Sequence, residues 1–89
     1  GMAAPRLLAL PNPASDRVRL LGARVAEGPV ELRVLDALGR AVFVDRIAGA
    51  PTVEWDLRDR TGRRVAAGLY WLELRHAGRR IGATQFVVR

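Results

Sequence analysis

The side chains that could act as nucleophiles or bases are few. The sequence holds one serine, Ser15, one histidine, His76, and no cysteine. Nucleophilic catalysis needs a nucleophile, a base within hydrogen-bond reach and a group that orients the base. Ser15 lies in a turn, where a hydroxyl usually bonds to the local backbone, and His76 is expected to be a solvent-exposed turn residue. We therefore predict no catalytic residue and expect that the protein is not an enzyme.

A second group of polar side chains has the composition of a calcium loop. Its members are close in sequence and rich in oxygen: Asp56, Asp59, Thr61 and Gly62. A hard cation prefers such ligands around a sharp turn. The same stretch, however, carries four arginines: Arg58, Arg60, Arg63 and Arg64. Because a calcium loop needs a net negative charge, we expect an ordinary polar connection between strands, with neither a metal site nor a cofactor site.

One large aromatic side chain, Trp71, is predicted on the solvent side of a strand. An exposed indole near an arginine, here Arg75, can stack on a sugar or a base. It can equally cover the sheet by packing on arginine stems, which is the commoner arrangement. The sequence leaves both readings open, so Trp71 and Arg75 are a candidate surface contact.

The net charge is strongly basic. The 15 Lys+Arg residues outnumber the 9 Asp+Glu residues, the formal net charge is +6, and every basic residue is arginine. Excess positive charge favours nucleic acid or another polyanion as a partner, but these arginines alternate with acids, as in Glu31/Arg33 and Glu73/Arg75. We therefore expect a mixed-charge, solvated surface with no specific nucleic-acid partner. An arginine-rich module for an anionic partner is the alternative.

Length and composition limit the architecture to one domain. A chain of 89 residues supports a single core, and without cysteine that core rests on packing alone. No apolar run reaches the roughly 18 to 20 residues that a membrane span needs, so no transmembrane segment is predicted. Gly1 ahead of Met2 is typical of a tag remnant. We assign residues 1–4 to a tag or linker and residues 5–89 to the domain.

Apolar residues recur with period two along most of the chain, which is the pattern of half-buried strands. Turn-forming residues separate these runs. The runs predict strands near residues 6–10, 17–21, 30–35, 41–47, 52–57, 69–75 and 80–88. The predicted fold class is all-β, an immunoglobulin-like antiparallel β-sandwich of about seven strands. The residues predicted to form its core are Leu20, Val30, Leu32, Val34, Val42, Trp55, Tyr70, Leu72 and Leu74.

Tight turns are expected at two places. Residues 36–39 and Ala77-Gly78 should each close a hairpin, with a glycine at the position that needs a positive φ. Strict alternation within residues 69–75 places Trp71 and Glu73 on the solvent side of that strand.

Several blocks of the sequence carry recognisable motifs. Residues 8–16 contain a Pro-Asn-Pro turn, residues 30–40 an Asp and a Gly-Arg turn, and residues 67–74 a Gly-Leu-Tyr strand start, and residues 86–89 are apolar and then basic. Together these blocks resemble the type A C-terminal sorting domain of the type IX (Por) secretion system. The resemblance implies a role in recognition for its motif residues: Pro11, Asn12, Pro13, Gly39, Arg40, Gly68, Tyr70, Val87, Val88 and Arg89.

The middle of the chain follows another pattern. Residues 53–68 are similar to the Ig-like domain of the flagellar hook-capping protein family, although Leu57 stands where that family usually has glycine. Some motif residues also have plain structural roles. Pro11 and Pro13 bend the chain and blunt an edge against pairing, and the hydroxyl of Tyr70 can tie down a neighbouring connection, as in other sandwiches.

The resemblance to sorting domains implies a folded, non-catalytic address at the C-terminus of a larger secreted protein from a Bacteroidota-like bacterium. The implied partners are the secretion and attachment machinery of the outer membrane and a covalently linked N-terminal cargo domain. The implied location is secreted or on the cell surface, by way of the periplasm, with the domain cleaved off and the cargo released or given a lipid anchor. We expect a monomer. The alternative is an Ig-like accessory module that spaces domains, or binds glycan or protein, on a secreted or flagellar protein.

Overall fold

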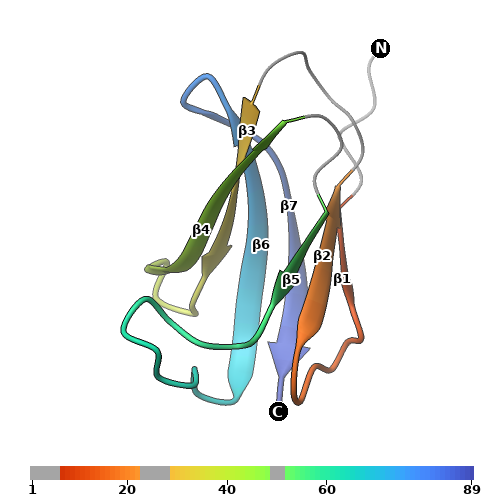
Figure 1. The fold of residues 1–89 in the computed structure, drawn as a ribbon, viewed down its shortest axis with the longest axis vertical. Coiled ribbons are helices and arrows are strands. Elements are labelled where there is room, and N and C mark those ends of the chain that lie inside the picture. The colour runs from red at the N-terminus through yellow and green to blue at the C-terminus, as the bar shows by residue number, and fades with distance from the viewer. Residues whose placement is uncertain (1–6, 23–28, 49–51) are drawn as a thin grey trace.

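The computed structural model describes residues 7–22, 29–48 and 52–89, which form two packed β-sheets (Figure 1). One sheet has three strands in the order β1-β2-β5, the other has four in the order β4-β3-β6-β7, and the pairing is antiparallel throughout. The strands are β1 Leu7–Leu10, β2 Val18–Gly22, β3 Pro29–Leu35, β4 Ala41–Ala48, β5 Thr52–Trp55, β6 Gly68–His76 and β7 Arg79–Val88. The predicted all-β sandwich is confirmed, and the described residues include no helix long and apolar enough to cross a membrane. The predicted tag or linker, residues 1–4, lies outside the described residues.

The strands lie where the alternation predicts them, and the boundary that differs most is that of β5. It was predicted to reach residue 57 but ends at Trp55. Leu57 adopts a left-handed backbone with φ of 62° and is fully buried. Such a backbone cannot continue an extended strand. It is also the conformation that glycine adopts most easily.

The predicted core is confirmed except at Val42, which is half-buried. A bulge in the pairing of β3 with β4 leaves Val42 without a partner, because Val34 pairs with Phe43 and Leu35 pairs with Ala41. Val42 and Phe43 are both half-buried and both pack against the core, and Phe43 contacts Trp55 with ring centroids 5.7 Å apart.

Four aromatic rings hold the two sheets together. Trp55 of the three-stranded sheet contacts Tyr70 and Phe86 of the four-stranded sheet edge-on, at centroid distances of 6.3 and 6.4 Å, in addition to Phe43. Its indole Nε1 donates a hydrogen bond to the carbonyl of Arg58 at 2.8 Å. Aromatic side chains bury large areas, and edge-to-face pairs add further stabilisation of roughly 0.5–1.5 kcal/mol each. Trp55 is thus the centre of the core.

One residue of β6 contradicts the simple alternation. Glu73 was predicted on the solvent side, and it does point away from the core, yet it is only 3% exposed. The reason is that arginine side chains on the same face cover it, among them Arg33 of β3 and Arg80 of β7.

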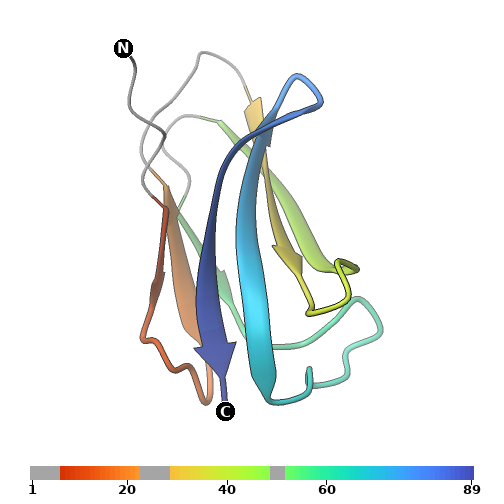
Figure 2. The same ribbon diagram turned by 180° about the vertical axis from the view of Figure 1, so that it is seen from behind.

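Both predicted hairpins are present and lie toward opposite ends of the sandwich (Figures 1 and 2). The β3–β4 turn contains Gly39 with φ of 82°, and the β6–β7 turn contains Gly78 with φ of 78°, as predicted. The β3–β4 turn points toward the end where β1 connects to β2, where residues 56–67 connect β5 to β6, and where β7 ends. We call this the C-terminal end of the sandwich, defined by residues 11–17, 36–40, 56–67 and Arg89.

Candidate functional site

The loop that follows β1 is bonded to the end of β7. The side chain of Asn12 accepts a hydrogen bond from the backbone N–H of Val87 at 2.9 Å through its Oδ1 atom. Ala14, which is fully buried, donates its N–H to the carbonyl of Val87 and accepts the N–H of Arg89, both at 2.8 Å. These bonds cover the free edge of β7 near its end. They also bring the predicted residues Pro11 to Pro13 beside Val87 to Arg89.

Arg64 ties a third segment to this junction. Its Nη2 atom donates to the carbonyl of Ser15 at 2.6 Å and to the carbonyl of Arg89 at 2.9 Å. One guanidinium therefore links the 56–67 connection, the β1–β2 connection and the end of β7. From the sequence, Arg64 was expected only to oppose calcium binding through its positive charge. Its partners are 49 and 25 residues away in sequence, so no local pattern points to them.

The β3–β4 hairpin is organised by one carboxylate. Asp36 accepts hydrogen bonds from the backbone N–H groups of Leu38 and Arg40 and from the Nε of Arg40, each at 2.9 Å. The backbone N–H of Arg40 is the main cause that lowers the pKa of Asp36 below its ordinary value of 3.8. The Arg40 side chain is 74% exposed, so the Gly-Arg turn presents a positive charge to solvent.

The candidate calcium loop folds as the predicted polar connection. Asp59 accepts hydrogen bonds from the hydroxyl and N–H of Thr61, at 2.6 and 2.9 Å, and from the N–H of Arg63 at 3.1 Å. The Thr61 hydroxyl is the main cause that lowers the pKa of the Asp59 carboxyl. Asp56 accepts the N–H of Arg58 at 3.1 Å. In the described part of the chain, no three His, Cys, Asp or Glu side chains group in a way that could hold a metal ion.

Tyr70 ties the same connection to the start of β6. Its hydroxyl donates a hydrogen bond to the carbonyl of Ala66 at 2.6 Å, which confirms the predicted role. Burial raises the pKa of Tyr70, and the nearby carboxylate of Asp36 raises it further. Gly68, two residues earlier, has φ of 152°, a backbone that residues with a side chain rarely adopt.

These residues border a shallow groove of about 410 Å³ between the β3–β4 hairpin and the segment that leads into β6. Arg40, Gly68 and Tyr70 line it together, and Gly39 adjoins it in the hairpin. The predicted recognition residues, from four separate sequence blocks, thus gather at the C-terminal end of the sandwich or lead into it.

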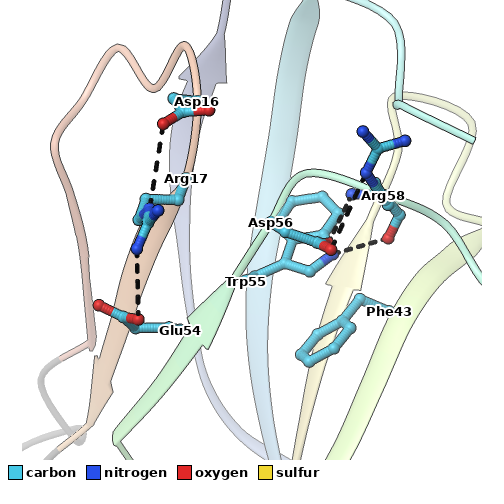
Figure 3. Close-up of a pocket in the computed structure, with 7 residues that line it drawn as sticks. All are labelled: Asp16, Arg17, Phe43, Glu54, Trp55, Asp56 and Arg58. Atoms are coloured by element: carbon cyan, nitrogen blue, oxygen red, sulfur yellow. Dashed lines mark hydrogen bonds and ion pairs between the residues drawn. The ribbon is translucent and has the colours of Figure 1, made fainter. Parts of the chain in front are cut away.

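Figure 3 shows a larger hollow, of about 560 Å³, beside β5. Its charged groups pair with one another, since Arg17 lies 4.0 Å from both Asp16 and Glu54. The Trp55 ring at its base is 1% exposed and donates its N–H within the chain. The hollow therefore offers little aromatic surface to a ligand, and no predicted recognition residue lines it.

The other two candidate residues lie elsewhere. Trp71 and Arg75 project from the outer face of the four-stranded sheet, where Trp71 is 36% exposed. Arg75 donates to the carbonyl of Gly78 at 2.6 Å and pairs with Glu73 at 3.5 Å. His76, predicted in the turn, is instead the last residue of β6 and is half-buried beside Pro29.

No protein-family model matches the sequence, and no curated protein matches it either. The fold is similar to part of PorZ, a surface component of the type IX secretion system of Porphyromonas gingivalis. That match has a TM-score of 0.71 and 24% identity and covers 93% of this chain and 11% of PorZ. Dimeric latent PorU from the same bacterium matches with a TM-score of 0.70 and 18% identity, over 99% of this chain and 10% of PorU.

A protein of a different kind shares the fold. The alkylpurine DNA glycosylase AlkC of Pseudomonas fluorescens, bound to DNA with an abasic-site analogue, matches with a TM-score of 0.60 and 17% identity, over 94% of this chain and 29% of AlkC. The chain therefore spans about a tenth of the length of PorZ and PorU and under a third of AlkC. At these identities the likeness establishes the sandwich fold alone.

Proposed function

We propose that this domain is a non-catalytic, type A C-terminal sorting domain that directs a larger cargo protein through the type IX secretion system to the cell surface. Its partners would be the secretion and attachment machinery of the outer membrane and a cargo domain joined to its N-terminal side. The domain would act by presenting a folded surface, because a sorting signal needs recognition and no bond chemistry.

The observation that carries the proposal is the convergence of the motif blocks. The Pro-Asn-Pro loop, the Gly-Arg turn, the Gly-Leu-Tyr strand start and the end of β7 are spread over the whole chain. In the fold they meet at or lead to the C-terminal end of the sandwich, joined by Asn12, Arg64 and Tyr70. A recognition surface made from distant segments exists only in the folded domain, as a folded address requires. The similarity in fold to PorZ and PorU supports the same assignment.

The non-catalytic part of the proposal rests on the use of the polar groups. The carboxylates of Asp36, Asp56 and Asp59 accept hydrogen bonds from turn backbone. The carbonyl of Ser15 is held by Arg64. These groups stabilise connections between strands, which supports a structural role for them.

A reporter tests the proposal. A protein with a Sec signal peptide at its N-terminus and residues 5–89 at its C-terminus should reach the surface of a bacterium that has a working type IX system. It should remain in the periplasm of a translocon mutant. Surface exposure is measured by protease treatment of intact cells. Equal surface exposure with and without residues 5–89, in a strain proven to export a known cargo, would reject sorting.

Matched arginine variants separate recognition from folding. Arg40→Ala removes an exposed charge at the C-terminal end, whereas Arg79→Ala removes an exposed charge at the opposite end. Arg40→Ala should lower export several-fold with a small change in stability, and Arg79→Ala should leave export unchanged. If both variants export as the parent does, the C-terminal end is not the recognised surface.

The second candidate is an Ig-like accessory module that spaces domains or binds a glycan or protein. The observation in its favour is that a secretion-system component and a DNA glycosylase share this sandwich, since one fold commonly hosts unrelated functions.

A module for an anionic partner is a third reading, because the chain carries a net charge of +6. We propose that binding to DNA or heparin is weak and lost at about 0.15 M salt; sub-micromolar, sequence-selective binding there would favour the third reading.

A further inference from the structure

The outer face of the four-stranded sheet is divided into an apolar half and an arginine-rich half. The apolar half carries Leu69, Trp71 and Val87, which are 42%, 36% and 38% exposed. Leu69 and Val87 are direct cross-strand partners, and Trp71 is next along the same face of β6. Successive residues on one face of a strand are about 6–7 Å apart, so these three side chains form a contiguous patch.

Beyond Trp71 on the same face of β6 lies Glu73, surrounded by arginines. Its Oε2 accepts a hydrogen bond from the Nε of Arg80 at 2.8 Å. Its Oε1 lies 3.5 Å from the Nη1 of Arg75 and 3.6 Å from the Nη1 of Arg33, and has no hydrogen-bond partner. One buried carboxylate thus holds guanidinium groups from three adjacent strands: β3, β6 and β7.

The arginines are fixed in place but remain partly exposed. The side chains of Arg33 and Arg75 are 30% and 29% exposed, and that of Arg80 is 56% exposed. A fourth, Arg46 of β4, is 79% exposed and pairs with Glu31 at 3.6 Å. Four arginines against two glutamates leave this half with an excess of two positive charges. Because Glu73 already restricts three of these guanidinium groups, those arginine side chains would lose little conformational entropy when a partner binds them.

We infer that this face, which we call the Trp71 face, is a docking surface for an acidic protein partner. Protein interfaces are enriched in tryptophan and arginine and depleted in lysine and acids at their centres, and tryptophan and arginine supply most of the binding energy. The Trp71 face exposes tryptophan and arginine to solvent, and its central carboxylate, Glu73, is buried beneath the arginines. The partner would place an apolar side chain on Trp71 and carboxylates on Arg75 and Arg80.

Charge also discriminates among occupants. A second copy of the domain is a poor occupant, because two such faces would set arginine against arginine or against the apolar half. A nucleic acid or an acidic polysaccharide would have the negative charge to pair with the arginines. It would, however, offer no apolar group to pack against Leu69 and Val87. The Trp71 face meets the C-terminal end of the sandwich at Leu69, which also lines the groove, and at Val87, which is a predicted recognition residue. The inference is argued from Trp71, Arg75 and Arg80 and does not rest on the proposed sorting role.

The inference is tested with a random 12-residue peptide library displayed on phage and selected on the folded domain. Enriched peptides should combine acidic residues with one or two large apolar residues. A synthetic copy of the best peptide should bind at least about tenfold more weakly to Trp71→Ala, as expected for a central tryptophan, and several-fold more weakly to Arg80→Ala. Leu8→Ala and Arg19→Ala on the three-stranded sheet are the matched controls, with exposures of 53% and 59%, and should bind as the parent does.

A measurement on the unmodified domain removes any dependence on how the variants fold. Amide NMR shifts caused by the synthetic peptide should concentrate at Trp71, Glu73 and Gln85. Failure to enrich acidic peptides, shifts on the three-stranded sheet, or full binding to Trp71→Ala would overturn the inference. It is also overturned if polygalacturonate or phosphatidylglycerol vesicles bind this face and the peptides do not, or if the domain dimerises through it.

Discussion

The C-terminal end of the sandwich and the Trp71 face are built by different kinds of interaction. At the C-terminal end, side chains such as Asn12, Asp36 and Arg64 bond to backbone groups of distant segments or turns. On the Trp71 face, side chains bond to one another around Glu73. The first arrangement fixes the path of the chain in the connections and leaves side chains such as Arg40 exposed to solvent. On the Trp71 face, strand pairing sets the path of the backbone. The ion pairs around Glu73 restrict the side chains that are exposed to solvent or to a partner.

We expect the largest loss of stability at Leu57, the residue of the C-terminal end that is fully buried in the core. Leu57→Ala removes a fully buried side chain and keeps the unfavourable left-handed backbone, so the free energy of unfolding should fall by about 2–5 kcal/mol. Leu57→Gly removes one carbon more, the Cβ atom, but relieves roughly 1 kcal/mol of backbone strain. Urea unfolding should therefore rank Leu57→Gly above Leu57→Ala, and the reverse order would show that the φ of 62° is not a source of strain.

The next effect concerns the Trp71 face. Glu73→Gln removes the negative charge that three arginines surround, and we expect a loss of about 1–3 kcal/mol of stability because the hydrogen bond from Arg80 is charge-assisted. Glu54→Gln is the control, since its exposed carboxylate is 3.7 Å from Arg19 and such surface pairs contribute below about 1 kcal/mol. If urea unfolding gives the same loss of stability for Glu73→Gln and Glu54→Gln, the burial of Glu73 does not strengthen its interactions with the arginines.

A smaller effect is expected at Arg64. Arg64→Ala removes the donor to two backbone carbonyls. We expect the free energy of unfolding to fall by about 1 kcal/mol, because these hydrogen bonds lie at a solvent-exposed site. The more specific readout is amide hydrogen exchange, which should accelerate at Ala14 and Arg89. Arg60→Ala in the same connection is the control. If exchange at Ala14 is unchanged, Arg64 does not hold the junction together.

The smallest effect is a dependence on pH, which belongs to the C-terminal end. The pKa values of Asp36 and Asp59 are lowered in the folded protein, so their stabilising contribution is present above the unfolded value of 3.8 and is lost as pH falls through the folded values. Urea midpoints should therefore decline below about pH 4, and the decline should be shallower in Asp36→Asn and in Asp59→Asn. An unchanged decline in both variants would contradict this assignment.

Much of the fold follows from local pattern. Period-two alternation locates the strands because each sheet has one buried face, and the glycines locate the hairpins because those turns need a positive φ. The role of Tyr70 was also predictable, since a hydroxyl at a strand start has a connection within reach. These features depend on residues close in sequence.

The remainder depends on tertiary neighbours. Alternation assigns Glu73 to the outer face but does not reveal that arginines from adjacent strands cover it. The bond from Val87 to Asn12 spans 75 residues and exists only because the two sheets pack. The bulge that leaves Val42 only half-buried arises from the register of β3 against β4. The motifs that resemble sorting domains predicted the residues of the candidate site. That these residues lie close together is a property of the fold.

The most direct test of the proposed sorting function is to move the domain along the chain. Two reporters with the same Sec signal peptide carry residues 5–89 either at the C-terminus or between the signal peptide and the reporter, and protease accessibility on intact cells is measured in a type IX-competent strain. A sorting address must be presented at the end of the cargo, so we predict surface exposure for the C-terminal arrangement and periplasmic retention for the internal one. Equal exposure for both arrangements, or for neither, would contradict it.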